Sequence, residues 1–451
     1  MRYLFTTLNG EGLGLLARAL PIAGELAGRG HTVAFCGSPP SAKIVIAKAG
    51  FENLRPRHPM YYIRPAEADL SGIIRTMRSE EVRRDFSGSF KFLRQLVRVI
   101  PWSVSPRRFV SDIWNVDHLQ TMIGSLSANY VRSDVEALMT VMTDWNADVI
   151  VDFWNPHACI AARATRKPLI TVIQADVHPE SAGFIWWKQP PPHVPTAVPV
   201  FNKILASYNL PPIRKTGELL TGDLTLVLGT PELDPLPQTA RVTYVGPLAW
   251  QKADGKMPDS LNSLRKDRPV IWLYPGNPRY LHWETAHDSA VVARACVAAL
   301  SNEDVQIVLS TGNMPLADGV LPLPANFIHE PFVPALAMAK KCHLMIHHGG
   351  YGSCQTGLYS GTPQLIIPTM TERESNARRV AAVGAGDFMV PISLDAKGRK
   401  KRVPIEEMRA KVKKMLSDPS YKANAMRISE KLQSYGGPSE AARLIEEESR
   451  R

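Results

Sequence analysis

The chain has 451 residues, more than one ordinary hydrophobic core accommodates, which predicts two domains. Hydrophobic residues make up 45% of it and charged residues 21%, the composition of a soluble globular protein. Its five cysteines are scattered without a CxxC pair, so we expect a reducing compartment and neither a disulfide framework nor a zinc site. Neither a run of 18 apolar residues nor a basic and then hydrophobic leader occurs, which predicts a cytoplasmic protein.

The net charge of +11 permits binding to anionic nucleotides, nucleic acid or lipid headgroups without choosing among them. Nucleic acid is the weakest of these partners, because no nucleic-acid-binding motif accompanies the basic residues. Basic residues are most concentrated in 91–114, where they alternate with Phe, Trp and Leu. Two interpretations stay open: a weak peripheral contact with an anionic membrane, or a solvated helix and loop beside a binding site, which we favour.

The first half of the chain begins with a predicted parallel βαβ unit. A strand at 3–8 leads through the loop 9–14 into a helix at 15–29, and a second strand follows at 32–36. Later in this half we predict a helix at 131–143 and strands at 148–152, 169–173, 224–228 and 242–245. The Pro- and Trp-rich stretch 179–215 is predicted to be an irregular loop that forms part of a pocket.

The second half repeats this plan after a polar stretch that we interpret as an interdomain linker. Strands are predicted at 270–274, 305–310, 325–329, 344–347 and 364–367, and helices within 404–435 and 439–448. This alternation predicts an α/β fold of two doubly wound, Rossmann-like domains. The predicted units are an N-terminal domain (1–246), the linker (247–268), a C-terminal domain (269–435) and a C-terminal helix (436–451).

Residues 345–386 carry the strongest functional signal. A short apolar strand ends in an HHGG turn at 347–350, a helix rich in small residues follows, and a second apolar strand comes next. This order predicts a phosphate cradle, because glycines let backbone N–H groups approach a ligand and a helix N-terminus carries partial positive charge. His348 and Ser353 add side-chain donors, and a cluster of charges at 372–374 suits a hydroxylated ring beyond the phosphates.

Three consecutive motifs, HHGGYGS, GTPQLIIP and E-R-x-x-N-A-R-R-V, resemble the donor-binding signature of the UGT-like nucleotide-sugar glycosyltransferases. This superfamily includes the bacterial antibiotic and macrolide glycosyltransferases of the MGT type. The resemblance implies the GT-B fold, in which two Rossmann-like domains face each other across a cleft and a C-terminal helix crosses back to the first domain. It also implies a UDP- or dTDP-sugar as co-substrate, inverting transfer without a metal ion, and no further cofactor.

The resemblance assigns the donor-binding residues. His348 would hydrogen-bond a phosphate, Phe332 would stack on the nucleobase, and the Val333 backbone would read the base edge. Asn277 would approach the phosphates or serve only in a turn. The full set of predicted donor-binding residues is Asn277, Phe332, Val333, His348, Gly350, Gly352, Ser353, Glu372 and Arg373.

Two positions depart from the family's pattern. Arg373 stands where a glutamine usually follows the sugar-binding carboxylate, here Glu372. Because a guanidinium adds charge and a rigid donor fork, this predicts either an altered sugar preference, such as an anionic or deoxy sugar, or an arginine turned outward into solvent. Thr356 stands where many members place a ribose-binding glutamate, which leaves the nucleobase open.

The usual catalytic base of the family is missing, because Leu15 occupies the position of its histidine. His31 is no substitute, since we expect it at the far end of the helix, capping a turn. Three explanations stay open: another base, an acceptor acidic enough to need none, or a protein that binds nucleotide sugar without transferring it. The candidate bases are Glu11, Asp117 and His118, with His157 as a further one.

The predicted acceptor pocket contains Trp154, His157, His178 and Trp186, with Phe184 and Trp187 beside them, unless the paired tryptophans only cover the sheet. The leading hypothesis is an inverting hexosyltransferase that acts on a small, secondary-metabolite acceptor. The alternatives are a MurG-like peripheral transferase with a lipid-linked acceptor and a catalytically silent binding protein. The oligomeric state, monomer or homodimer, stays open.

Overall fold

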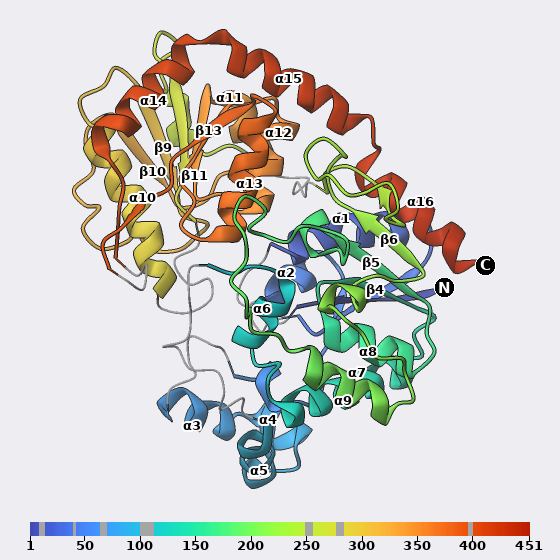
Figure 1. Ribbon diagram of the computed structural model, residues 1–451. Helices are drawn as coiled ribbons and strands as arrows, with labels where there is room; N and C mark the ends of the chain where they lie inside the picture. The colour runs from blue at the N-terminus through green and yellow to red at the C-terminus, as the bar shows by residue number, and fades with distance from the viewer. Residues whose placement is uncertain are drawn as a thin grey trace.

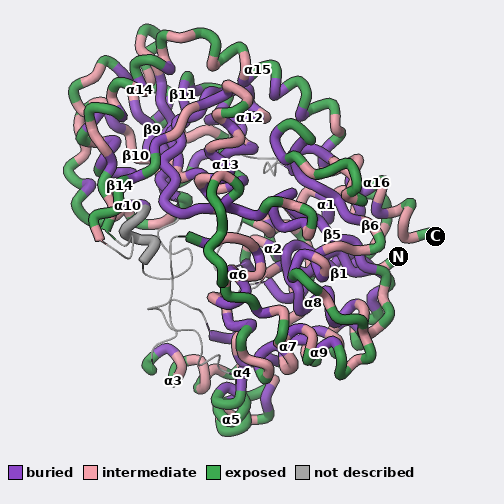
Figure 2. Tube along the Cα trace, viewed as in Figure 1, coloured by how far each residue is buried: buried purple, intermediate pink, exposed green. Residues whose placement is uncertain are grey.

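The structure is a computed structural model that describes residues 1–8, 14–38, 42–63, 70–99, 112–248, 256–276, 284–395 and 400–451, with only the backbone at 284–288. Two parallel sheets, each covered by helices, lie in separate halves of the molecule (Figure 1). The strands of both sheets are buried along most of their length (Figure 2). Each sheet therefore forms the centre of its own hydrophobic core.

The N-terminal sheet has the strand order β3-β2-β1-β4-β5-β6-β7 and is parallel throughout. Alternate residues of β1 enter different cores, because Tyr3 and Phe5 pack on one face while Leu4 packs on the other. Burial on both faces explains why these strands are nearly continuous apolar runs. The strands are β1 (Arg2–Thr7), β2 (Thr32–Cys36), β3 (Glu52–Leu54), β4 (Val149–Phe153), β5 (Leu169–Ile173), β6 (Leu224–Val227) and β7 (Thr243–Tyr244).

The helices around this sheet begin where the sequence offers caps. The Ser127 side chain accepts from the Tyr130 amide at the start of one helix, and the Asn155 side chain accepts from two amides at the start of another. The covering helices are α1 (Leu16–Gly28), α2 (Lys43–Lys48), α6 (Val116–Met122), α7 (Ala128–Asp144), α8 (Pro156–Ala164) and α9 (Val198–Ser207). The prediction that 179–215 is irregular throughout is wrong, because α9 lies within it and buries Phe201.

A separate group of short helices projects from the lower edge of the N-terminal half in Figure 1. It consists of α3 (Leu70–Arg78), α4 (Glu80–Asp85) and α5 (Ser89–Val99), with a 3₁₀ turn at Pro59–Tyr61. The group has its own small core, in which Tyr62, Phe86 and Phe92 pack edge to face.

The C-terminal sheet is also parallel, with the order β10-β9-β8-β11-β12-β13. Its strands are β8 (Val270–Tyr274), β9 (Gln306–Ser310), β10 (Phe327–Glu330), β11 (Leu344–His347), β12 (Gln364–Ile366) and β13 (Gly386–Phe388). Its helices are α10 (Glu284–Leu300), α11 (Ala335–Lys341), α12 (Tyr351–Tyr359), α13 (Thr371–Ala382), α14 (Ile405–Ser417) and α15 (Pro419–Gln433). A small antiparallel pair, β14 (Ile392–Ser393) and β15 (Lys401–Arg402), is added to this half.

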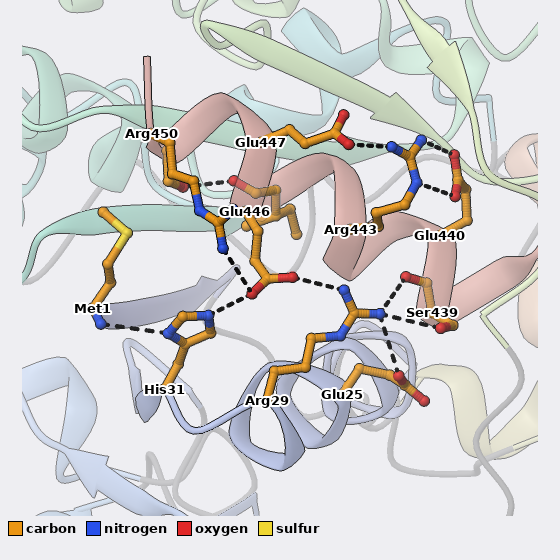
Figure 3. Close-up of polar contacts among 12 residues, drawn as sticks. Met1, Glu25, Arg29, His31, Ser439, Glu440, Arg443, Glu446, Glu447 and Arg450 are labelled. Carbon is orange, nitrogen blue, oxygen red and sulfur yellow. Dashed lines mark hydrogen bonds and ion pairs between the residues drawn. The ribbon is translucent and has the colours of Figure 1, made fainter.

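The last helix, α16 (Gly437–Ser449), crosses back and packs along α1 of the N-terminal half (Figure 1). Its apolar face adds Ala441, Ala442 and Ile445 to that core. Figure 3 shows the polar part of this contact, in which Glu446 accepts hydrogen bonds from Arg29 and His31, each at 2.7 Å. His31 lies in the turn that ends α1, as expected, where its amide donates to the Leu26 carbonyl, and its side chain also ties this turn to α16.

The two chain crossings between the halves touch each other. The Gly437 amide donates to the Val245 carbonyl at 2.9 Å. Gly246 and Gly436 have positive φ angles of 75° and 78°, a backbone conformation that favours glycine. A Cβ added at Gly246 would lie 2.8 Å from the Cβ of Tyr435, so the close approach of the two crossings also requires glycine.

No helix in the described part of the chain combines the length and the apolar character that crossing a bilayer requires. The predicted domain boundaries stay a proposal, although one sheet ends at Tyr244 and the next begins at Val270.

Candidate functional site

The HHGG turn lies between β11 and α12, at the carboxyl end of the C-terminal sheet. Gly349 has a φ of 89°, which turns the chain sharply, and Gly350 is the N-cap residue of α12. The first backbone N–H groups of a helix have no partner within it, and they add to the positive end of the helix dipole. A Cβ at Gly352 would meet nothing within 4 Å, so there is open space at this helix terminus. The turn can therefore bind a phosphate group.

His348 is held against two glycines of the cradle. A Cβ at Gly276 would lie 2.9 Å from the imidazole, and one at Gly350 would lie 2.6 Å from its Nε2 atom. The Nδ1 atom of His348 is buried and has no hydrogen-bond partner among the described residues. Burial and the positive charge of Arg373 lower the pKa of His348 well below its usual value. A hydrogen bond with the Tyr274 backbone has the opposite, smaller effect on this pKa, so the ring is neutral at physiological pH and carries one N–H.

Neighbouring side chains keep the turn in shape. The Nδ1 atom of His347 accepts from the Gly349 amide at 3.1 Å, and its Nε2 atom lies 2.8 Å from Gln364 Oε1. Asn376 on α13 donates to the Gly349 carbonyl at 3.0 Å and to Glu372 Oε1 at 2.9 Å. The cradle is thereby tied to the helix that carries the predicted sugar-binding residues.

Arg373 points into the protein. Its side chain is only 5% exposed and donates to Thr369 Oγ1 at 2.7 Å, so the alternative of an arginine turned outward into solvent is wrong. Its charge acts on His348 and Tyr274, which lie beside the cradle. Glu372 is half-buried on the same helix turn. The first turn of α13 thus carries a carboxylate held by Asn376 and a buried guanidinium held by Thr369.

The residues predicted to hold the nucleobase lie after β10. The Phe332 side chain is 49% exposed, whereas Val333 is buried. An exposed aromatic ring at a strand end provides a free face for stacking. Thr356 donates its hydroxyl to the Gly352 carbonyl of its own helix at 2.8 Å, so that hydroxyl is engaged locally. Ser353 is half-buried in the first turn of α12, and Asn277 lies outside the described residues.

The aromatic residues predicted for the acceptor side form two groups. Trp154 stacks on Phe184 with ring centroids 6.4 Å apart, and its φ of 66° is unusual for a bulky residue. Trp186 instead reaches the other domain, where its Nε1 atom donates to Ser375 Oγ on α13 at 3.1 Å. The Arg378 guanidinium lies 4.4 Å from the centre of the Trp187 ring. The loop carrying these tryptophans therefore docks on α13, and the alternative that they only cover the sheet is wrong.

The candidate bases have different surroundings. Asp117 Oδ1 accepts from both the amide and the hydroxyl of Thr216, at 2.7 and 2.6 Å. His118 is buried, which lowers its pKa, and its Nδ1 atom accepts from the Trp114 amide. His178, a residue predicted for the acceptor pocket, is also buried with a lowered pKa, and its Nδ1 atom accepts from the Glu180 amide. Glu11 lies outside the described residues.

His157 is part of a buried polar chain. Its Nδ1 atom lies 2.7 Å from Asp134 Oδ2, and its Nε2 atom lies 3.3 Å from Ser125 Oγ. A cavity of about 20 Å³ adjoins these three side chains, room for one water molecule. The hydrogen bond from His157 and the nearby His58 lower the pKa of Asp134 against the opposing effect of burial. This arrangement can orient an imidazole, but it lies within the N-terminal half.

The sequence interpretation missed a set of charged and polar residues between the two sheets. Arg379 Nη1 pairs with Asp234 Oδ1 at 2.6 Å, and Tyr351 donates to Asp234 Oδ2 at 3.0 Å. Arg18 donates to Gln174 Oε1 at 3.2 Å, which fixes a residue just after β5. Polar residues directly after a parallel strand are the signal that could have indicated them, since ligands bind at this edge of such sheets. The segment that best fits this pattern is Gln174-Ala175-Asp176, directly after β5.

Comparison with known proteins agrees with this geometry. Residues 294–447 match the family model of the C-terminal domain of erythromycin biosynthesis protein CIII-like proteins. The structure is similar to that of the glycosyltransferase VinC in complex with dTDP, with a TM-score of 0.64 and 18% identity over all of both chains. The C-terminal part of the chain, residues 294–447, is therefore similar to the UGT-like glycosyltransferase superfamily, and the chain as a whole has the GT-B fold.

Two curated members of the superfamily illustrate the relation. The 4'-demethylrebeccamycin synthase of Lentzea aerocolonigenes is 30% identical over 247 residues, which are 52% of this chain and 53% of that protein. The UDP-glucosyltransferase YojK of Bacillus subtilis is 27% identical over 230 residues, 50% of this chain and 52% of that protein. The chain thus spans about half the length of the curated relatives that it matches.

Leu15 occupies the position that the sequence resemblance assigns to a catalytic histidine. The half-buried Leu15 lies beside the N-terminus of α1, where it packs against both cores of the N-terminal half. A leucine in that position cannot accept a proton, so a transfer reaction that requires a general base must take it from another element.

Proposed function

We propose that the protein transfers a sugar from a dTDP- or UDP-sugar to a small-molecule acceptor with inversion at the anomeric carbon. The observation that carries the proposal is the cradle, where the neutral His348 has an unpartnered Nδ1 atom beside the open N-terminus of α12. Its donors suit a diphosphate. The proposal includes the nucleotide sugar as co-substrate and no other cofactor.

The related proteins support the choice of donor. VinC forms a complex with dTDP, and YojK is named as a UDP-glucosyltransferase. The antibiotic-type relatives, such as the 4'-demethylrebeccamycin synthase, support a secondary-metabolite acceptor.

The residues of the cradle suggest how the reaction is assisted. As the anomeric carbon–oxygen bond breaks, negative charge grows on the leaving diphosphate. The backbone N–H groups of α12 and the N–H of His348 would stabilise that charge. Glu372 would accept hydrogen bonds from the sugar hydroxyls, and the adjacent guanidinium of Arg373 would bias the choice of sugar.

A thermal-shift panel of dTDP, UDP and their glucose conjugates tests the donor assignment. A ligand that binds only the folded protein raises its apparent stability by about 2.7 kcal/mol at a concentration of 100 Kd. We expect a shift with at least one diphosphate and a smaller one in His348→Ala. The absence of a shift with every nucleotide would contradict the proposal, whereas binding without any release of nucleoside diphosphate would favour a silent binding protein.

One observation favours a lipid-linked acceptor as the second candidate. On α5, Phe92, Leu96 and Val99 face the core, while Phe90, Leu93 and Val97 form an exposed apolar stripe. Phe90 is 76% exposed, and basic residues alternate with the stripe. An apolar stripe flanked by positive charge is typical of helices that lie on anionic membranes.

Co-sedimentation with phosphatidylglycerol vesicles distinguishes the two candidates. A peripheral enzyme should pellet with these vesicles and less so after Phe90→Ser, and phosphatidylcholine vesicles serve as the uncharged control. Protein that stays in the supernatant with both kinds of vesicle would contradict the lipid-linked alternative.

A further inference from the structure

Asp176 is a buried carboxylate between the two sheets that the cradle does not use. It lies in the 3₁₀ turn Ala175–Val177, directly after β5, and the hydroxyl of Ser181 fixes its backbone carbonyl at 2.8 Å. The side chain is 1% exposed, and neither of its oxygens has a hydrogen-bond partner among the described residues. An unpaired buried carboxylate destabilises the folded state. Its presence therefore points to a role other than stability.

Charged groups from three other parts of the chain face Asp176. They are Arg18 on α1, Asp234 after β6, and Glu372 and Arg379 on α13. Burial is the largest effect and raises the pKa of Asp176 to about 7; Glu372 and Asp234 also raise it, while Arg379 and Arg18 lower it. Both arginines have contacts elsewhere, because Arg379 pairs with Asp234 and Arg18 donates to Gln174.

The position of Asp176 relates it to the reacting centre of the proposed transfer. Arg18 is one helical turn after Leu15, and its guanidinium lies 4.8 Å from the centre of the ring of Tyr351, the first residue of α12. The charge of Glu372, the predicted sugar-binding carboxylate, also acts on Asp176. Asp176 is thus near the phosphate cradle, the sugar-binding helix and the position where the family's histidine is missing.

We propose that Asp176 is the general base that accepts the acceptor's proton, in place of the histidine that Leu15 replaces; this rests on the proposed glycosyl transfer. The acceptor hydroxyl gives its proton to a carboxylate oxygen as its lone pair forms the bond to the anomeric carbon. The bond from that carbon to the diphosphate breaks, and the diphosphate leaves with the electron pair. The protonated Asp176 then releases its proton to solvent. Because the side chain lies between elements of both domains, opening of the domains admits the acceptor.

The test compares Asp176→Asn with the wild type and with a matched control, Asp152→Asn. Asp152 is also buried, and burial raises its pKa to about 7. Unlike Asp176, it accepts hydrogen bonds on its oxygens, from the Thr6 hydroxyl at 2.5 Å and from the Asn155 amide at 3.0 Å. The assay follows release of nucleoside diphosphate from dTDP-glucose and UDP-glucose between about pH 5 and pH 9, which brackets the pKa of an effective base. Benzyl alcohol and 4-nitrophenol serve as weakly and strongly acidic acceptors, beside water alone.

We expect the wild-type rate with benzyl alcohol to rise with pH and to level off above about pH 7. The rate of Asp176→Asn should be roughly 10²- to 10⁴-fold lower and should no longer rise with pH. The loss should be much smaller with 4-nitrophenol, which needs little help to ionise. Asp176→Asn should keep its thermal shift with dTDP or UDP, and Asp152→Asn should keep the pH dependence even if it melts earlier.

An unchanged rate or pH dependence in Asp176→Asn would overturn the proposal, and so would an equal loss with both acceptors. If the wild type binds nucleotide but releases no nucleoside diphosphate, both the role of Asp176 and the proposed glycosyl transfer would be overturned. Release in the wild type with a retained pH dependence in Asp176→Asn would overturn the role of Asp176 alone.

Discussion

Gly350→Ala tests whether His348 binds the nucleotide without removing any group that could contact it. An added Cβ would lie 2.6 Å from His348 Nε2, whereas ordinary contacts begin near 3.4 Å, so the ring must move by about 0.8 Å. The backbone at Gly350 has a φ of −59°, which alanine adopts without strain, so the fold should persist. A hydrogen bond to a charged group contributes about 1.5 to 3 kcal/mol. Losing about half of that through misalignment should weaken nucleotide binding roughly 4- to 12-fold.

Calorimetric titration of dTDP and UDP measures this loss, and a double-mutant cycle identifies its cause. In a His348→Ala background, Gly350→Ala should cost no further affinity, because no imidazole remains to be displaced. Unchanged affinity in the single variant would refute the reasoning. An equal loss of affinity in the absence of His348 would also refute the reasoning, because it would mean that the added methyl group blocks the ligand itself.

Four further outcomes are expected. Asp134→Asn should lower the free energy of unfolding by about 3 kcal/mol, because it breaks a buried pair with His157, as urea titration would show. Burial lowers the pKa of His58 to about 4, and the pKa of Asp134 is also lowered, so wild-type stability should fall as pH drops below about 6.5 and further below about 4; constant stability would contradict this. Glu446→Gln should cost about 1 kcal/mol and hasten proteolysis of α16, since the partly exposed ion pair with Arg29 is weakened; equal cleavage rates would argue against it. Arg373→Gln should change the ranking of sugars in a donor panel, and an unchanged ranking would remove the residue from sugar selection.

Local patterns predicted much of the fold. Five strands of the C-terminal sheet and six of the N-terminal sheet were predicted within two residues, because apolar runs flanked by glycine or polar residues specify buried parallel strands. The sequence interpretation missed β3 (Glu52–Leu54) and β13 (Gly386–Phe388), since each has three residues and a charged one among them. Both strands are defined by their pairing with a neighbouring strand, β2 or β12, which no local pattern reports.

The difference between local patterns and long-range contacts also separates the parts of the site that the sequence predicted from those that it did not. The phosphate cradle is contiguous in sequence, so its turn and helix could be predicted from one motif. The contacts around Asp176 combine residues from 18 to 379, and their proximity depends on how the two sheets face each other. The docking of Trp186 on Ser375 is equally non-local, and the residue was predicted only as part of the acceptor pocket. Long-range partners of this kind require the three-dimensional structure.

The touching crossings at Val245 and Gly437 have a consequence for domain movement. Because the Gly437 amide is hydrogen-bonded to the Val245 carbonyl, we expect the two halves to rotate about this contact rather than slide past each other. Displacement during opening should then be small beside α16 and largest at the far side of the molecule (Figure 1). A pair of fluorophores on α1 and α16 would remain at a fixed separation, because both helices belong to one rotating body. A pair on α7 and α14 would report the rotation directly.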